Sequence, residues 1–265
     1  MSGDGHTPTG AAHSSATTRS PVHLARAWRD DTALHALNTW LEGLDASARL
    51  AWALANTTGR AVLSTSFGAQ SAAALHLVTR QEPDLPVVLV DTGYLFPETY
   101  RFADELKARL ALNLHVARAN ESPAWFEARH GQLWAEGLEG IEHYNRLRKV
   151  EPMTAMLDAI GATVWIAGLR RTQSGSRHSR QVLERAGARW KLHPIIDWTD
   201  RDVGGYLSGN GLPYHPLWSQ GYVSIGDTHS TRPVSADVDL EATRFFGLKR
   251  ECGLHEPAPA SITNG

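Results

Sequence analysis

The chain has 265 residues, of which 42% are hydrophobic, and this is enough to build the core of one sizeable α/β domain. Its 26 lysines and arginines against 28 aspartates and glutamates leave a formal net charge of −2, which argues against a protein that wraps nucleic acid. The single cysteine, Cys252, excludes an intramolecular disulfide, an iron–sulfur cluster held by several thiolates and a multi-cysteine zinc site.

The first twenty residues are rich in Gly, Ser, Thr and His and lack the apolar core of a signal peptide. We therefore predict a disordered leader over residues 1–20. No run approaches the roughly 18 apolar residues of a membrane helix, so we expect no membrane association and a cytoplasmic location.

Apolar periodicity then predicts the elements in chain order. Leucines spaced three to six residues apart over 31–55 predict one or two amphipathic helices, with Asp30 or Asp31 as the N-cap. Short β-type runs alternating with helical patterns follow this region. We expect strands over 61–66, 86–90, 112–116, 163–167 and 190–195, and helices over 69–79 and 97–110.

This alternation predicts a parallel sheet covered by helices on both faces, in an α/β domain that spans residues 21–240. From Asn210 onward, Gly, Pro and aromatic residues predict loops, closed by a short helix near 240–246. Residues 241–265 are predicted to form a mobile tail that carries Cys252.

Ligands of parallel sheets bind beyond the carboxyl ends of the strands, so three strand ends are candidate site segments. The first, 64–71, is rich in hydroxyls and contains a glycine where strand passes into helix, which is typical of an anion cradle. Its candidate ligand-binding residues are Ser64, Ser66, Gly68 and Gln70.

The second strand end is Asp91-Thr92-Gly93, where an acid and a flexible glycine suit an adenine or a ribose. An ordinary strand-ending turn explains the same three residues.

The third strand end, 168–177, carries three arginines within eight residues, interrupted by small and hydroxyl side chains. Between Ile141 and Lys191 there are ten basic residues against four acidic ones, so this part of a nearly neutral chain has a local positive excess. The pattern predicts a small polyanionic ligand, with a solvated basic loop as the alternative. The candidate residues here are Arg170, Arg171, Ser174, Gly175 and Arg177.

Cys252 is followed by glycine and flanked by Lys249, Arg250 and His255. Cationic neighbours lower the pKa of a thiol from its usual value of about 8.5 and so favour the thiolate. We therefore interpret Cys252 as a nucleophile rather than as a small buried hydrophobic residue. The remaining histidines show no metal-ligand spacing, and no metal site is expected.

Four segments together carry a family resemblance. They are STSFGAQ at 64–70, DTGYLFPETY at 91–100, GLRRTQSGSR at 168–177 and KRECGLH at 249–255. The chain resembles the assimilatory phosphoadenylyl-sulfate (PAPS) reductases from about residue 61 to residue 256. The resemblance implies an adenine nucleotide α-hydrolase-like fold related to the PP-loop ATP pyrophosphatases, a homodimer, and thioredoxin or glutaredoxin as electron donor.

The resemblance also implies a reaction, the conversion of PAPS to sulfite and adenosine 3′,5′-bisphosphate for cysteine biosynthesis. The Cys252 thiolate would attack the sulfonyl sulfur and form S-sulfocysteine, and a dithiol donor would then release sulfite. His255 is a candidate for stabilising the thiolate. The cations expected to offset the charge of substrate and leaving group are Lys149, Arg170, Arg171, Arg177, Arg232, Lys249 and Arg250.

Two departures from related families narrow the expectation. The additional cysteine pairs of cluster-bearing relatives are absent, so no iron–sulfur centre is expected. No bound flavin is expected either. The loop at 66–71 has no carboxylate, which weakens the case for Mg–ATP chemistry. The alternatives are reduction of adenylyl sulfate (APS), an ATP-dependent PP-loop ligase, and a redox-regulatory module in which Cys252 forms only a mixed disulfide.

Overall fold

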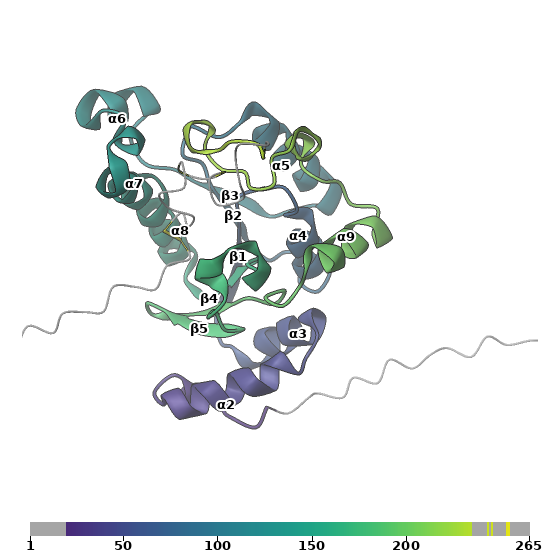
Figure 1. The fold of residues 1–265 in the computed structure, drawn as a ribbon. Helices are drawn as coiled ribbons and strands as arrows, with labels where there is room; N and C mark the ends of the chain where they lie inside the picture. Colours follow the sequence, from purple (N-terminus) through teal and green to yellow (C-terminus); the bar gives the residue numbers. More distant parts are fainter. Residues whose placement is uncertain (1–19, 235–242, 244, 246–252, 255–265) are drawn as a thin grey trace, which may run out of the picture.

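The structure is a computed structural model that describes residues 20–234, Thr243, Phe245, Gly253 and Leu254 (Figure 1). The predicted leader therefore lies outside the described residues except for Ser20. The helix expected near 240–246 likewise lies outside them, apart from Thr243 and Phe245.

A six-stranded sheet in the order β3-β2-β1-β4-β6-β5 forms the centre of the fold. The strands are β1 Arg60–Thr65, β2 Val87–Val90, β3 Leu114–Ala117, β4 Ala162–Ala167, β5 Leu183–Ala186 and β6 Arg189–Leu192. The five predicted strands are thus confirmed, and they pair in parallel. The sixth strand, β5, corrects the expectation of a purely parallel sheet, because it pairs antiparallel with β6 through a tight turn in which Gly187 has a φ of +59°.

Helices connect and cover the strands. They are α1 Leu24–Ala27, α2 Asp31–Glu42, α3 Ala46–Asn56, α4 Ala72–Thr79, α5 Pro97–Leu110, α6 Pro123–His130, α7 Gly137–Asn145, α8 Glu151–Ile160 and α9 Asp200–Gly209. A π-helical turn, η2 Arg146–Val150, joins α7 to α8, and short 3-10 turns lie at η1 Leu133–Ala135, η3 Arg171–Gln173, η4 Gly175–Arg177, η5 Pro216–Gln220 and η6 Thr228–Ser230. The helical region predicted at 31–55 is two helices, because Asp30 and Asp45 each accept backbone N–H groups as N-caps.

The two faces of the sheet are buried against different helices, as strand alternation requires. Leu63 and Ile166 point into a large core with residues of α2–α5 and α9, whereas Val62 and Val88 point into a smaller core with Met153 and other residues of α8. The prediction of helices on both faces is therefore confirmed.

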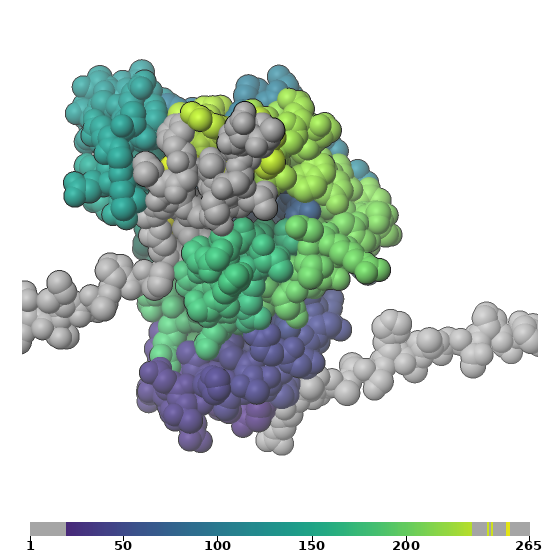
Figure 2. All heavy atoms as spheres, in the orientation of Figure 1, coloured from purple at the N-terminus to yellow at the C-terminus, as the bar shows by residue number. Residues whose placement is uncertain are grey.

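Figure 2 shows α6 and α7 at the upper left of the molecule and α2 and α3 at the bottom. In the described part of the chain, no helix has the length and apolar character needed to cross a membrane.

The strand order places a topological switch between β1 and β4. The chain leaves β1 through α4 toward β2, while β4 lies on the other side of β1 and leads toward β6. The connections at the carboxyl ends of β1 and β4 therefore diverge, and a crevice is expected between them.

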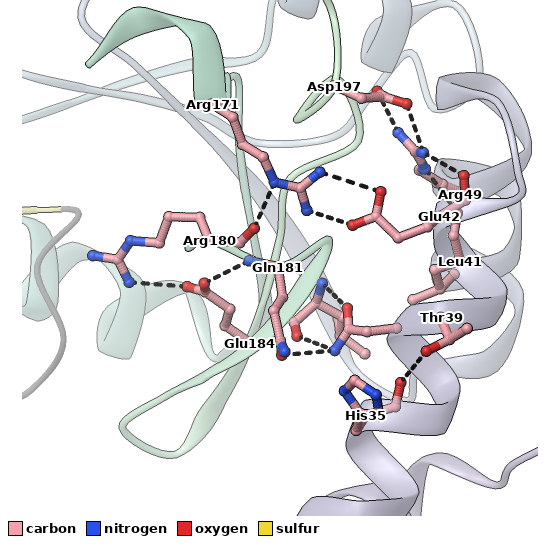
Figure 3. A network of polar contacts seen from close by, with 12 residues as sticks. His35, Thr39, Leu41, Glu42, Arg49, Arg171, Arg180, Gln181, Glu184 and Asp197 are labelled. Atoms are coloured by element: carbon pink, nitrogen blue, oxygen red, sulfur yellow. Dashed lines mark hydrogen bonds and ion pairs between the residues drawn. The ribbon is translucent and has the colours of Figure 1, made fainter. Parts of the chain in front are cut away.

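Helices α2 and α3 are joined to the loop after β6 by Arg49, whose side chain is fully buried. Its guanidinium donates to the backbone carbonyls of Leu41, Glu42 and Pro194 and to both carboxylate oxygens of Asp197, at 2.6 and 2.8 Å (Figure 3). This set of bonds fixes the N-terminal helices on the sheet.

Candidate active site

A cavity of about 360 Å³ lies at the carboxyl ends of β1 and β4, where the strand order predicts a crevice. Its wall comes from the ends of the strands, from η2, from the loop after β4 and from the loop at 223–227. Of the predicted residues, those that line it are Ser64, Ser66, Gly68, Gln70, Thr92, Lys149, Arg170 and Arg177.

The loop after β1 forms one wall of the cavity. Phe67 is fully buried and has a φ of +47°, and its N–H is bound by the Thr65 hydroxyl at 3.0 Å. On the adjacent strand, the Trp165 indole Nε1 donates to Ser64 Oγ at 2.7 Å. The carbonyl of Ala69 accepts the backbone N–H of His215 at 3.0 Å. The loop is thus held by contacts from three sides.

The loop after β4 supplies Arg170 to the cavity wall, beside the loop after β1. Its guanidinium is buried, and Nη2 donates to Gln70 Oε1 at 2.5 Å and to Asp200 Oδ1 at 3.0 Å. Nη1 is also buried, and it has no hydrogen-bond acceptor among the described residues. A buried charged donor of this kind is expected to bind an anionic ligand. Arg177 lines the same wall and donates to Gln173.

Arg171 points the other way. It donates through Nη1 to Glu42 Oε2 at 3.2 Å and through Nε to the Arg180 carbonyl at 2.8 Å, and its Nη2 also binds Glu42 (Figure 3). It lines a polar groove beside α2 and not the cavity. The structure therefore departs from the expectation that both arginines of the pair face the ligand.

A buried ion pair between Lys149 and Asp227 joins η2 to the loop before η6 in the cavity wall. The Lys149 Nζ lies 2.6 Å from Asp227 Oδ2, and the Thr92 hydroxyl donates to Oδ1 at 2.5 Å. Burial alone would raise the pKa of Asp227, but the positive charge of Lys149, together with His229 and the hydrogen bonds, holds this pKa at about 2. Asp227 is thus a carboxylate that orients Lys149 in the cavity wall.

Asp91 lies beside the cavity but outside its wall, as does Gly93. The Asp91 carboxylate accepts hydrogen bonds from Tyr100 Oη at 2.6 Å, from Arg118 Nε at 2.8 Å and from the Gly93 N–H at 2.9 Å. Although burial opposes ionisation, the hydrogen bonds and the charge of Arg118 lower its pKa. Asp91 therefore fixes the end of β2, while the neighbouring Thr92 reaches the cavity.

The remaining predicted residues lie elsewhere. Ser174, Gly175 and Arg232 do not line the cavity. Cys252, His255, Lys249 and Arg250 lie outside the described residues. Leu254, two positions after Cys252, does line the cavity.

Sequence reasoning missed two carboxylates of the site, Asp200 and Asp227. The one signal for Asp227 was Lys149, because a lysine that is buried in a site needs a carboxylate partner. Over the residues that the structure describes, no group of three or more His, Cys, Asp or Glu side chains is arranged to hold a metal ion.

Comparisons with known proteins agree with this geometry. Residues 60–233 match the phosphoadenosine phosphosulfate reductase domain family. The chain is 61% identical over 223 residues to a phosphoadenosine 5′-phosphosulfate reductase of Alkalilimnicola ehrlichii, covering 84% of this chain and 91% of that protein. It is 60% identical over 223 residues to the reductase of Xanthomonas campestris pv. campestris, with coverage of 84% and 92%.

Solved structures show the same fold. The phosphoadenylyl-sulfate reductase of Candida auris, in a phosphate complex, matches with a TM-score of 0.67 at 28% identity, over 77% of this chain and 98% of that one. FMN adenylyltransferase of Candida glabrata matches with a TM-score of 0.55 at 15% identity, over 87% and 79% of the two chains, which is a likeness of fold alone.

Proposed function

The chain belongs to the phosphoadenosine phosphosulfate reductase family, and on that premise we propose that it reduces PAPS to sulfite in the cavity at the ends of β1 and β4. The observation that carries the proposal is the set of cations in the cavity wall, Lys149, Arg170 and Arg177. They meet a hydroxyl-rich loop that has no carboxylate of its own.

The size and charge of the cavity suit a nucleotide with several anionic groups. A cavity of about 360 Å³ falls within the range of about 300–1,000 Å³ that is typical of small-molecule sites. Arg170 Nη1 finds no acceptor in the described part of the chain, so a phosphate or sulfate oxygen would complete its hydrogen bonding. The same cations would stabilise the negative charge that develops on the leaving phosphate.

In the proposed reaction, the Cys252 thiolate attacks the sulfur of the sulfonyl group. A sulfur–sulfur bond forms, the bond from sulfur to the phosphate oxygen breaks, and adenosine 3′,5′-bisphosphate leaves with the electron pair. A dithiol donor then attacks the Cys252 sulfur, sulfite departs with the sulfur–sulfur electron pair, and the donor's second thiol releases Cys252 as the donor becomes a disulfide. The position of Leu254 in the cavity wall, two residues after Cys252, supports this assignment.

The same proposal includes the other parts of the reaction system. The donor is thioredoxin or glutaredoxin, the enzyme works as a cytoplasmic homodimer without a bound cluster or flavin, and His255 stabilises the Cys252 thiolate. Lys249, Arg250 and Arg232 add positive charge to the substrate side. One cysteine per chain suffices because the dithiol donor supplies the two electrons.

Replacing the nucleophile tests the mechanism directly. We expect Cys252→Ser to bind adenosine 3′,5′-bisphosphate within about twofold of wild type and to form no sulfite, because a hydroxyl at neutral pH is a far weaker nucleophile than a thiolate. The wild-type protein incubated with PAPS and no donor should gain one sulfonate on Cys252 by intact-mass spectrometry. Sulfite production by the serine variant at the wild-type rate would refute the mechanism.

The nucleotide itself is tested by comparing PAPS with APS at equal concentration. The cations of the cavity and the absence of a carboxylate in the loop at 66–71 predict faster turnover of PAPS, because the 3′-phosphate adds charge for these cations to bind. Equal or faster turnover of APS would contradict the proposed substrate, and consumption of ATP without either nucleotide would favour a PP-loop ligase.

A further inference from the structure

Lys191 is a buried lysine on β6 that contacts the C-terminal part of the chain. Its Nζ donates to the backbone carbonyl of Leu254 at 2.6 Å, across 63 positions of sequence. The same ammonium lies 3.7 Å from the centre of the Trp165 ring on the neighbouring strand, in cation–π geometry. Lys191 thus joins the face of the sheet to a residue of the predicted tail.

The backbone next to Leu254 is closely fitted to the same region. Gly253 has a φ of +83°, and a Cβ at this position would lie 3.2 Å from Val150 Cγ2 and 3.6 Å from Asn145 Cβ. The Leu254 side chain packs against the smaller core, which contains Met153 and against which Trp165 also packs. Residues 253 and 254 are therefore seated between η2 and the sheet by packing as well as by the Lys191 hydrogen bond.

Consecutive side-chain contacts connect the packing site of residues 253 and 254, which we call the seat, to the cavity. Trp165, which receives the Lys191 ammonium on its ring, donates from Nε1 to Ser64 Oγ at 2.7 Å, and Ser64 lines the cavity. The three residues lie on the adjacent strands β1, β4 and β6, and Trp165 and Lys191 are direct neighbours in the parallel register. The seat of residue 254 is thus built on the same strands as the ligand cavity.

We propose that Lys191 is a positioning residue, which holds the backbone of Leu254 against the cavity while the sulfonate is transferred. This inference rests on the proposed function, because Cys252, two residues earlier, is the proposed acceptor of the sulfonate. A hydrogen bond from a buried ammonium to a carbonyl is stronger than one between neutral groups, and holding a reacting group in place raises the rate of the chemical step. Lys191 acts on the first half of the reaction, since the donor must later reach the modified sulfur.

The test is Lys191→Met in the full chain, which keeps the length of the side chain and removes the ammonium. We expect single-turnover labelling of Cys252 by PAPS, without donor, to slow at least about tenfold, while the affinity for adenosine 3′,5′-bisphosphate stays within about twofold. Lys191→Arg keeps the charge and should recover part of the rate. Lys107→Met, the same change at an exposed position of α5, is the matched control and should label at the wild-type rate.

A second readout does not depend on the nucleotide. Trypsin cleavage after Lys249 or Arg250 should be at least several-fold faster in Lys191→Met than in wild type and Lys107→Met, because Leu254 has lost a hydrogen bond that holds it. Unchanged cleavage, or unchanged Cys252 labelling, would overturn the assignment of Lys191. A parallel fall of labelling, nucleotide affinity and thermal stability would also overturn it, because it would show a purely structural role. Failure of PAPS to label wild-type Cys252 would instead refute the proposed function, and the cleavage rates would still decide the role of Lys191.

Discussion

Arg170 and Arg171 are adjacent in sequence, yet their side chains lie on different sides of the loop after β4, one toward the cavity and one toward α2. The Arg170 side chain is 4% exposed and lies in the cavity wall, whereas that of Arg171 is 26% exposed and lies against α2. Arg171 uses Nε, Nη1 and Nη2 for bonds to Glu42 and to the Arg180 carbonyl. Arg170 keeps Nη1 without an acceptor among the described residues.

The difference shows that the neighbouring carboxylate determines whether an arginine keeps a donor nitrogen available for a ligand. Glu42 binds Arg171 through both of its oxygens, which makes that guanidinium part of the scaffold. Asp200 binds only one nitrogen of Arg170, and its own side chain is 77% exposed and well solvated. Among the described residues, the cavity side therefore keeps one guanidinium nitrogen, Arg170 Nη1, without an acceptor, whereas each nitrogen of Arg171 has one.

The largest effect is expected on the cavity side, where charges are most deeply buried. Asp227→Asn leaves the Lys149 ammonium without its carboxylate and should lower the free energy of unfolding by about 3–5 kcal/mol, measured by urea denaturation. The double variant Asp227→Asn with Lys149→Met should recover most of this loss. On the α2 side, Glu42→Gln should cost at most about 1 kcal/mol, because its ion pair is partly exposed. Equal losses at Asp227 and Glu42 would remove the contrast between the two sides.

The next largest effect concerns His215, whose backbone N–H donates to the Ala69 carbonyl in the loop after β1. Its Nδ1 accepts the Leu217 N–H at 3.1 Å and its Nε2 lies 3.1 Å from the Thr99 hydroxyl, so the ring is neutral, and burial lowers its pKa to about 4. The unfolded chain takes up a proton near pH 6.5, whereas the folded chain does so only near pH 4. Stability is therefore lost as the pH falls between these values, by about 3 kcal/mol.

The measurement is urea denaturation at several pH values from 7 to 4. Burial also lowers the pKa of His193, whose Nε2 lies 3.6 Å from Glu184 Oε2, and the pKa of His76, so these two histidines add to the slope. His215→Asn keeps an acceptor for the Leu217 N–H and should remove the contribution of the cavity side. An unchanged slope in this variant would contradict the assignment to His215.

The smallest effect gives the sharpest comparison. Arg170→Met should weaken binding of adenosine 3′,5′-bisphosphate by about 1.5–3 kcal/mol, because a charged hydrogen bond to the ligand is lost. Arg171→Met should leave this affinity unchanged and lower stability by at most about 1 kcal/mol. Calorimetric titration and thermal unfolding of the two variants measure both quantities. A loss of nucleotide affinity in Arg171→Met equal to that in Arg170→Met would show that both arginines reach the ligand.

Much of the fold was predictable because short β-type runs alternate with helical patterns along the chain. Val87–Val90 is uniformly buried, and Pro97 marks the first turn of α5, which begins and ends where the sequence predicts. β5 was missed because Leu183–Ala186 includes two charged residues and shows no apolar run. Its pairing depends on β6 and on the turn at Gly187 rather than on its own composition.

The candidate site was predictable in its location but not in the direction of its side chains. Strand ends predict where a ligand binds, and the loop after β1 does line the cavity. That Arg171 faces α2 depends on Glu42, and that Lys149 is held in the wall depends on Asp227, and both partners are remote in sequence. No local spacing indicates such pairs, because tertiary packing brings them together.

The bond from Lys191 to residue 254 has a consequence for how this region can vary among relatives. Its acceptor is a peptide carbonyl, which every amino acid supplies, so the contact itself places no demand on the identity of residue 254. Residue 253 is different, because a φ of +83° and the approach of Val150 restrict it to glycine. The Lys191 hydrogen bond should therefore survive substitution of residue 254, where only the packing of the side chain is at stake, whereas the backbone at residue 253 accepts glycine alone.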